Sequence, residues 1–185
     1  LLQTEDDFCR YFESRLRRIL YAWKHMRADM VVEPVVHIPI AIRGLDYGEQ
    51  PLPTTGVMGV DIVERTLTTD ARNEIVSHHY IDQLATEEDV QKFAVPTIEV
   101  DEETTTGAEE MARHIFGGVI DIEMQGYFEA FSPWDDILKW RGAEQMLVDL
   151  ADRPELMHQI ISRYTDTRLS MLDQVEKQGR LGAIR

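Results

Sequence analysis

The order of hydrophobic and polar positions in the first forty residues changes its period once, which predicts a helix followed by a strand. Between residues 5 and 26, apolar side chains recur at three- and four-residue steps, as on one face of an amphipathic helix. Residues 30–40 then read MVVEPVVHIPI, a β-branched run long enough for a strand. A helix that leads directly into a strand is half of an α/β unit.

The predicted strand at residues 30–40 has one apolar face and one partly polar face, because side chains alternate along a strand. The polar face carries Glu33 and His37, whereas the other face carries only apolar residues: Val32, Pro34, Val36, Ile38 and Ile40. A barrel strand has a polar inner face where it leads into a pocket. The alternative is an edge strand with a solvated face, which the prolines favour.

A second predicted strand, at residues 118–126, repeats this arrangement after a predicted helix at residues 105–116. Its apolar face carries Ile120, Ile122 and Met124, and its polar face carries Asp121, Glu123 and Gln125. We expect the two polar faces to share one interior. Glu33, His37 and Glu123 are then the catalytic candidates as general acids or bases, and Asp121 and Gln125 are the substrate-binding candidates. The alternative, for each residue, is a salt-bridged group of the scaffold.

The rest of the chain predicts an α/β domain over residues 1–185 with one long excursion. Residues 43–56 form a loop, and the strand-like runs VDIVERTL and EIVSHHYI predict a hairpin within residues 57–82. The sequence TEED at residues 86–89 is a capping box that begins a short helix. Helices are also predicted at residues 133–140 and 143–150, and the longest runs from 154 to 178.

Composition narrows the possible partners. The chain of 185 residues has a formal charge of -15, which argues against a nucleic-acid partner and against an anionic membrane surface. It shows no signal-peptide pattern and no apolar run that could span a bilayer. Its one cysteine, Cys9, cannot form an internal disulfide, so we expect a reducing compartment, the cytoplasm. Phosphate-binding loops, nucleophile elbows and paired CxxC motifs are missing from the sequence.

Two long runs give the chain a family resemblance. They are FCRYFESRLRRILYAWKHMRADMVVEPVV at residues 8–36 and WDDILKWRGAEQMLVDLADRPELMHQIISRYTDTRLSMLDQVEKQG at residues 134–179. In their order, and most of all in the helix start DLADRPELMHQII, they resemble the uroporphyrinogen decarboxylase superfamily. The most similar branch is the one allied to corrinoid-dependent methyltransferases.

The resemblance implies part of a (β/α)8 TIM-type barrel with its pocket at the carboxyl ends of the strands. This chain would supply the early strands and helices only, and further sequence or a second chain would complete the barrel. The implied activity is transfer of a methyl group from a small methylated donor to a cobalamin on a corrinoid protein. Zinc is the implied metal, but the family's His and Cys ligands lie in the later half, and no position here matches them.

The resemblance leaves two alternatives to methyl transfer. One is decarboxylation of a tetrapyrrole, although the arginine-rich motif that grips substrate carboxylates in the decarboxylases is not found here. The acidic inner faces also have the wrong sign of charge for a polyanionic substrate. The other alternative is a catalytically inactive barrel that binds a small molecule. A homo-oligomer is a further possible outcome of an incomplete barrel, because it would cover open sheet edges.

Overall fold

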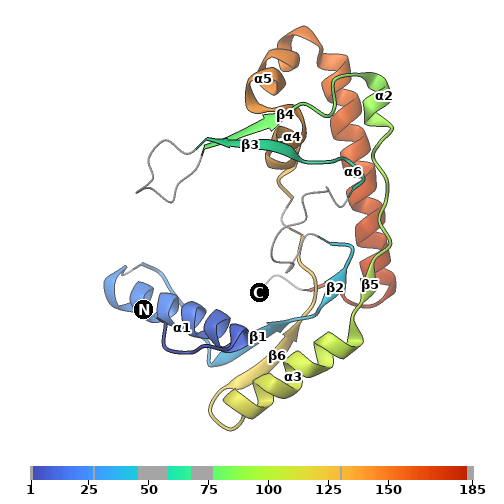
Figure 1. The fold of residues 1–185 in the computed structure, drawn as a ribbon. Helices are drawn as coiled ribbons and strands as arrows, with labels where there is room; N and C mark the ends of the chain where they lie inside the picture. The colour runs from blue at the N-terminus through green and yellow to red at the C-terminus, as the bar shows by residue number, and fades with distance from the viewer. Residues whose placement is uncertain (1, 27, 46–57, 68–76, 130, 183–185) are drawn as a thin grey trace.

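A computed structural model describes residues 2–26, 28–45, 58–67, 77–129 and 131–182. These residues form a crescent, with one sheet and two helices at its lower end and a helical group with a hairpin at its upper end (Figure 1). The longest helix, α6, runs along the outer side and joins the two ends. The mixed α/β class predicted from the sequence is confirmed. The helices are α1 (Asp7–His25), α2 (Glu87–Val90), α3 (Glu102–Phe116), α4 (Pro133–Arg141), α5 (Ala143–Asp152) and α6 (Pro154–Lys177); the strands are β1 (Val35–Pro39), β2 (Ile42–Arg43), β3 (Val63–Leu67), β4 (Ser77–Ile81), β5 (Glu99–Val100) and β6 (Asp121–Gln125).

The two strands with a polar and an apolar face are neighbours in one parallel sheet. β1 pairs with β6 in a register that places His37 opposite Glu123. The chain after α6 then runs parallel to the extension of β6. The Tyr127 amide donates to the Arg180 carbonyl oxygen at 2.8 Å, and the Gly182 amide donates to the Tyr127 carbonyl oxygen at 2.7 Å. Three segments separated in sequence by helices therefore run side by side in the same direction.

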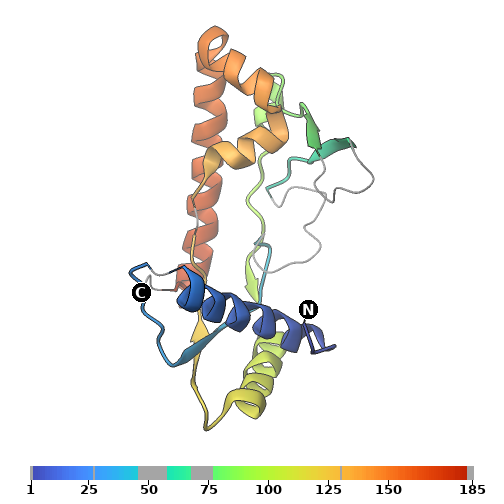
Figure 2. The ribbon, with the colours of Figure 1, turned by 90° about the vertical axis from the view of Figure 1, so that its left-hand side faces the viewer.

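Helices α1 and α3 cover the apolar face of the β1–β6 pair. Val36 and Ile38 are buried against Phe12 of α1 and Ala112 of α3. The rings of Phe12 and Phe116 meet edge to face, with 5.6 Å between their centroids. The prediction that the aliphatic side chains point toward surrounding helices is thus confirmed for this pair. Figure 2 shows α1 crossing the lower end of the molecule next to the sheet.

The strand predicted at residues 30–40 begins only at Val35. Residues 30–34 lie outside the ladder, although the Pro34 carbonyl oxygen still accepts a hydrogen bond from the Asp121 amide at 3.0 Å. Proline has no amide hydrogen to donate. The ladder can therefore use Pro34 only as an acceptor, and the regular strand starts after it.

Helix α1 is packed along only half of its length. Asp6 caps it by accepting from the Cys9 amide at 3.0 Å. Phe12 is buried, but Leu20 and Trp23, from the same predicted stripe, are 67% and 60% exposed. The amphipathic pattern therefore identified the helix correctly and overestimated how much of it the described residues bury.

The larger core runs along α6 and lies between α4, α5, α6 and the segments that flank the hairpin of β3 and β4. The indole of Trp140 donates to the Val60 carbonyl oxygen at 3.1 Å and packs edge to face on Phe93. The predicted hairpin within residues 57–82 is confirmed by the antiparallel β3–β4 pair. Its connecting residues, and residues 46–56 of the loop predicted at 43–56, lie outside the described part. The capping box is also confirmed, because Thr86 and Asp89 exchange side-chain and backbone hydrogen bonds.

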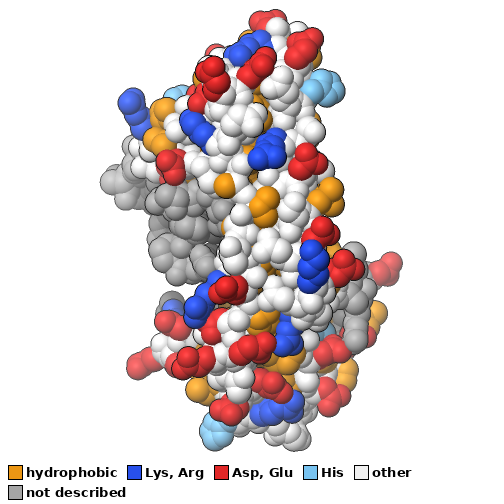
Figure 3. Space-filling model, turned by 90° about the vertical axis from the view of Figure 1, so that its right-hand side faces the viewer, with side chains coloured by type: hydrophobic (Ala, Val, Ile, Leu, Met, Phe, Trp, Pro, Cys, Tyr) orange, Lys and Arg blue, Asp and Glu red, His pale blue; other side chains and the backbone are white. Residues whose placement is uncertain are grey.

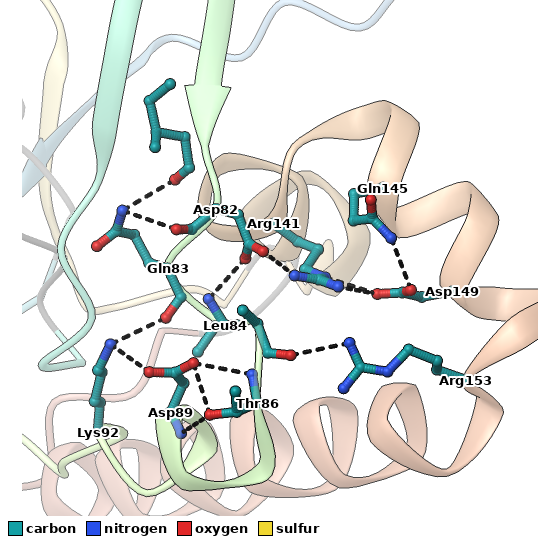
Figure 4. Close-up of polar contacts among 12 residues, drawn as sticks. Asp82, Gln83, Leu84, Thr86, Asp89, Lys92, Arg141, Gln145, Asp149 and Arg153 are labelled. Carbon is teal, nitrogen blue, oxygen red and sulfur yellow. Dashed lines mark hydrogen bonds and ion pairs between the residues drawn. The ribbon is translucent and has the colours of Figure 1, made fainter.

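A buried arginine joins the hairpin to the helices (Figure 4). Arg141, at the end of α4, contacts Asp82 after β4 and Asp149 of α5. Its Nε donates to Asp149 at 2.7 Å, and the Gln145 amide donates to the other oxygen of that carboxylate at 2.9 Å. Burial alone would raise the pKa of Asp149, but these hydrogen bonds hold it below its ordinary value.

The outer face of α6 is of mixed charge. Figure 3 shows acidic side chains interspersed with Lys and Arg over this face. Two glutamines of α6 bind the extended chain beside it: Gln174 accepts from the Ile98 amide at 3.0 Å, and Gln178 donates to the Ile98 carbonyl oxygen at 2.9 Å. These bonds hold the segment before β5 against the helix without a strand partner.

Candidate functional site

His37 and Glu123 face each other on the polar side of the β1–β6 pair. The register makes them direct cross-strand partners, and His37 Nδ1 lies 3.4 Å from Glu123 Oε2. The two side chains are 26% and 36% exposed. They are therefore ordered by the sheet and still open to a ligand.

The pair lies in an open cleft of about 330 Å³ near the carboxyl ends of β1 and β6. Gly126 and Gly182 allow its walls to meet. A Cβ on Gly126 would lie 2.5 Å from the Arg180 carbonyl oxygen, so only glycine admits the third parallel segment at this distance. The cleft is lined by His37, Glu123, Met124, Gln125, Gly126, Leu181 and Gly182.

The structure brings three of the five predicted site residues together. Gln125 follows Glu123 on the same face and also lines the cleft. Asp121 is exposed at the amino end of β6, opposite Val35. Glu33 is exposed and precedes the strand; it borders a different groove, along α1. The predicted grouping thus holds for His37, Glu123 and Gln125, whereas Glu33 and Asp121 lie outside the cleft.

A buried polar network directly beyond β6 was not predicted. Tyr127 donates to Glu129, and the Arg168 guanidinium of α6 lies 3.9 Å from that carboxylate. Arg168 also donates to Asp136 at 3.0 Å. Asp136 accepts from the Tyr164 hydroxyl as well, at 2.7 Å. These contacts tie the segment after β6 to α4 and α6.

The environment of this network shifts the pKa values of its members. Burial raises the pKa of Tyr164, and the hydrogen bond to Asp136 raises it further. Burial alone would raise the pKa of Asp136, but hydrogen bonds from Tyr164, Lys139 and Arg168 bring it below its ordinary value. At neutral pH the network thus contains a charged carboxylate, a charged guanidinium and a neutral phenol. Such an arrangement stabilises the segment that follows β6.

One signal in the sequence could have pointed to this network. The apolar stripe of α6 passes from Tyr164 to Met171, and Thr167 and Arg168 fill the gap on the same side of the helix. Both are buried. An arginine on the core side of a helix needs a carboxylate partner, because an unpaired buried charge is costly.

The zinc implied by the family resemblance does not fit the described residues. Within them, no three His, Cys, Asp or Glu side chains are placed so as to hold one metal ion. A catalytic zinc site uses three protein ligands, and the cleft offers two candidates, His37 and Glu123.

None of the helices that the structure describes is both long enough and apolar enough to cross a bilayer. Comparison with protein-family models, with curated proteins and with solved structures finds no match to this chain.

The chemistry open to the cleft follows from its lining. An imidazole beside a carboxylate is a candidate general acid or base. The carboxylate and the Gln125 amide can orient a polar or cationic ligand, and Leu181 offers apolar contact. The arrangement suits a small molecule.

Proposed function

We propose that this chain forms the early part of a (β/α)8 barrel that transfers a methyl group from a small methylated donor to a cobalamin carried by a partner protein. The observation that carries the proposal is the His37–Glu123 pair, which faces a cleft near the carboxyl ends of two parallel strands whose other face is covered by helices. Barrel enzymes carry their sites at this end of the strands.

The order of parallel segments supports the barrel. β1, β6 and the segment at Leu181 lie side by side in the order in which they occur in the chain. The interval between β1 and β6 contains the β3–β4 hairpin, the short β2–β5 ladder, α2 and α3, and the interval between β6 and Leu181 contains α4, α5 and α6. Among the described residues, no strand pairs with the other edge of β1. A groove of about 450 Å³ lies beside that edge, lined on one side by Leu16 and Ile19 of α1. An open edge with adjacent apolar surface suits the addition of further strand and helix units.

In the proposed reaction, the side chains of the cleft bind the donor and supply a proton to the leaving group. Glu123 orients the imidazole of His37 through Nδ1, and the Gln125 amide fixes the donor by hydrogen bonding. The bond from the methyl carbon to its leaving atom breaks, and that atom keeps the electron pair. The methyl group bonds to cobalt with the electron pair of the cob(I)alamin acceptor, which is oxidised to Co(III). His37 gives a proton to the departing group.

The test follows methylation of free cob(I)alamin by the purified full chain, through the absorbance change that accompanies methylcobalamin formation. A panel of methylated amines, sulfur compounds, alcohols and aromatic ethers serves as donors. We expect turnover with at least one donor, and a loss of about 10²-fold or more with His37→Ala. Glu110→Gln is the matched control, because Glu110 is exposed on α3. Failure of every donor would refute methyl transfer.

The tetrapyrrole alternative receives less support. Its substrate carries many carboxylates, whereas none of the residues lining the cleft in the described part is Lys or Arg. Incubation with uroporphyrinogen tests it directly: formation of coproporphyrinogen would establish decarboxylation in place of methyl transfer.

A further inference from the structure

The charge of the cleft restricts the kind of methyl donor that it can hold. Among the described residues that line it, Glu123 is the only side chain with a fixed charge, and His37 is the only other titratable group. Arg180 adjoins the lining residue Leu181, but its guanidinium donates to Glu102 at the start of α3, at 2.8 Å. Glu33 and Asp121 lie outside the cleft, toward the amino end of the sheet.

The cleft also offers contact for methyl groups. Leu181 lines it together with the methylene groups of Gln125 and the backbone of Gly126 and Gly182, whereas the side chain of Met124 packs against the cores on the other face of β6. A carboxylate beside apolar surface favours a cation whose charge is spread over methyl groups and is therefore weakly hydrated, because such a cation loses little hydration on binding. An anionic or strongly hydrated donor gains nothing comparable.

From these two features we infer that the donor is a methylated onium cation, with its methyl groups on a quaternary nitrogen or a tertiary sulfur. This inference rests on the proposed function and names the substrate class of the same cleft. Glu123 attracts the cation, the apolar lining receives its methyl groups, and Gln125 is placed to hydrogen-bond a polar substituent.

Onium chemistry fits the side chains that are present. For a quaternary ammonium donor, the C–N bond breaks with its electron pair left on nitrogen, and a neutral tertiary amine departs. The methyl group is taken up by the nucleophilic Co(I) of the acceptor, so cobalt is oxidised by two electrons. The C–N bond can break without prior protonation, and the released amine then takes a proton from solvent and leaves as an ammonium ion.

Binding of choline and of its neutral isostere 3,3-dimethylbutan-1-ol to the full chain, measured by titration calorimetry or ligand-observed NMR, isolates the role of charge. The two molecules differ at one atom, which is a positively charged nitrogen in choline and a neutral carbon in 3,3-dimethylbutan-1-ol. We expect choline to bind about tenfold more tightly, as for one half-exposed carboxylate near the cation. Glu123→Gln should remove this preference while leaving the isostere's affinity unchanged. Glu110→Gln, on the outer side of α3, should retain the preference.

The outcomes separate this inference from the proposed function. Equal affinity for the two molecules, binding of neither, or a preference that survives Glu123→Gln would overturn the assignment of an onium substrate. Selective binding of choline, without methylcobalamin formation from any donor, would keep the cation site and reject the methyltransferase. Turnover of neutral donors alone would keep the methyltransferase and reject the onium donor.

Discussion

Replacing Arg141 by methionine should cost far more stability than any surface substitution. Its side chain is 2% exposed and contacts two carboxylates, of which that of Asp149 is 1% exposed. Methionine preserves much of the volume of the side chain and removes its charge. Asp149 would then stay buried, with the Gln145 amide as the side-chain donor that remains to it among the described residues.

The magnitude follows from the buried carboxylate that is left behind. Removing one partner of a buried ion pair costs about 3–5 kcal/mol. With a urea m-value of about 2 kcal/mol/M, the unfolding midpoint should fall by about 1.5–2.5 M. Arg153→Met is the matched control, because Arg153 is exposed and donates only one hydrogen bond in the same region, to the Ala85 carbonyl oxygen at 2.9 Å. Arg153→Met should lower the free energy of unfolding by about 1 kcal/mol.

The contribution of Asp149 to the free energy of unfolding should change with pH in opposite directions in the wild type and in Arg141→Met. In the wild type, the lowered pKa of Asp149 contributes stability that is present above its ordinary pKa and is lost as pH falls through the folded-state value. In Arg141→Met, burial should raise that pKa, so Asp149 would contribute stability at low pH that is lost as pH rises. The deficit of the variant should therefore be smaller at pH 4.5 than at pH 7.5.

Urea unfolding followed by tryptophan fluorescence measures the unfolding midpoint and the free energy of unfolding of each variant, and repeating it at pH 4.5 and 7.5 gives the pH dependence. The double variant Arg141→Met/Asp149→Leu should recover much of the loss, because it removes both buried charges. Asp82 keeps a hydrogen bond from the Leu84 amide at 2.9 Å and is partly hydrated. The reasoning is refuted if Arg141→Met costs no more than Arg153→Met, or if the double variant is less stable than the single one.

Three further substitutions test the packing of the molecule by the same urea assay. Ile38→Ala, at a fully buried position between α1 and α3, should lose about 2–5 kcal/mol and Ile38→Val about 1 kcal/mol, and equal losses would contradict the buried sheet face. Tyr164→Phe should cost about 1–2 kcal/mol by removing one donor to Asp136; a gain in stability would contradict that hydrogen bond. Thr86→Ala should cost about 1 kcal/mol through loss of the capping box, whereas Thr86→Ser should be near neutral.

The sequence predicted the elements better than the contacts between them. The helix predicted to start at residue 154 and end at 178 corresponds to α6, and the hairpin runs correspond to β3 and β4. Each rests on periodicity or on local cap and turn chemistry, which act over a few residues. The ladder of β2 and β5 has only two residues in each strand, paired between Ile42 and Val100. Such a short ladder depends on long-range packing, so no local pattern could reveal it.

The candidate site was predicted as a set of faces, and strand pairing decided which residues meet. Alternation along each strand correctly assigned His37 and Glu123 to the polar faces, since it needs only local geometry. The meeting of these two residues depends on the register between two strands whose paired residues lie 86 positions apart in the sequence. Register is set by burial of Val36 and Ile38 against both helices, which sequence periodicity alone does not place.

The position of Glu33 shows how strand pairing decides which acidic residues belong to the cleft. By alternation, Glu33 belongs to the same face as His37, yet the ladder starts after Pro34 and leaves Glu33 exposed beside α1. Glu123 is held beside its cross-strand partner, His37. Glu33 lies outside the ladder and so has no cross-strand partner in the β1–β6 pair. If the cleft discriminates by charge, Glu33→Gln should therefore change the choline preference much less than Glu123→Gln does. An equal effect would mean that the field of the whole acidic face, and not the carboxylate at the cleft, selects the ligand.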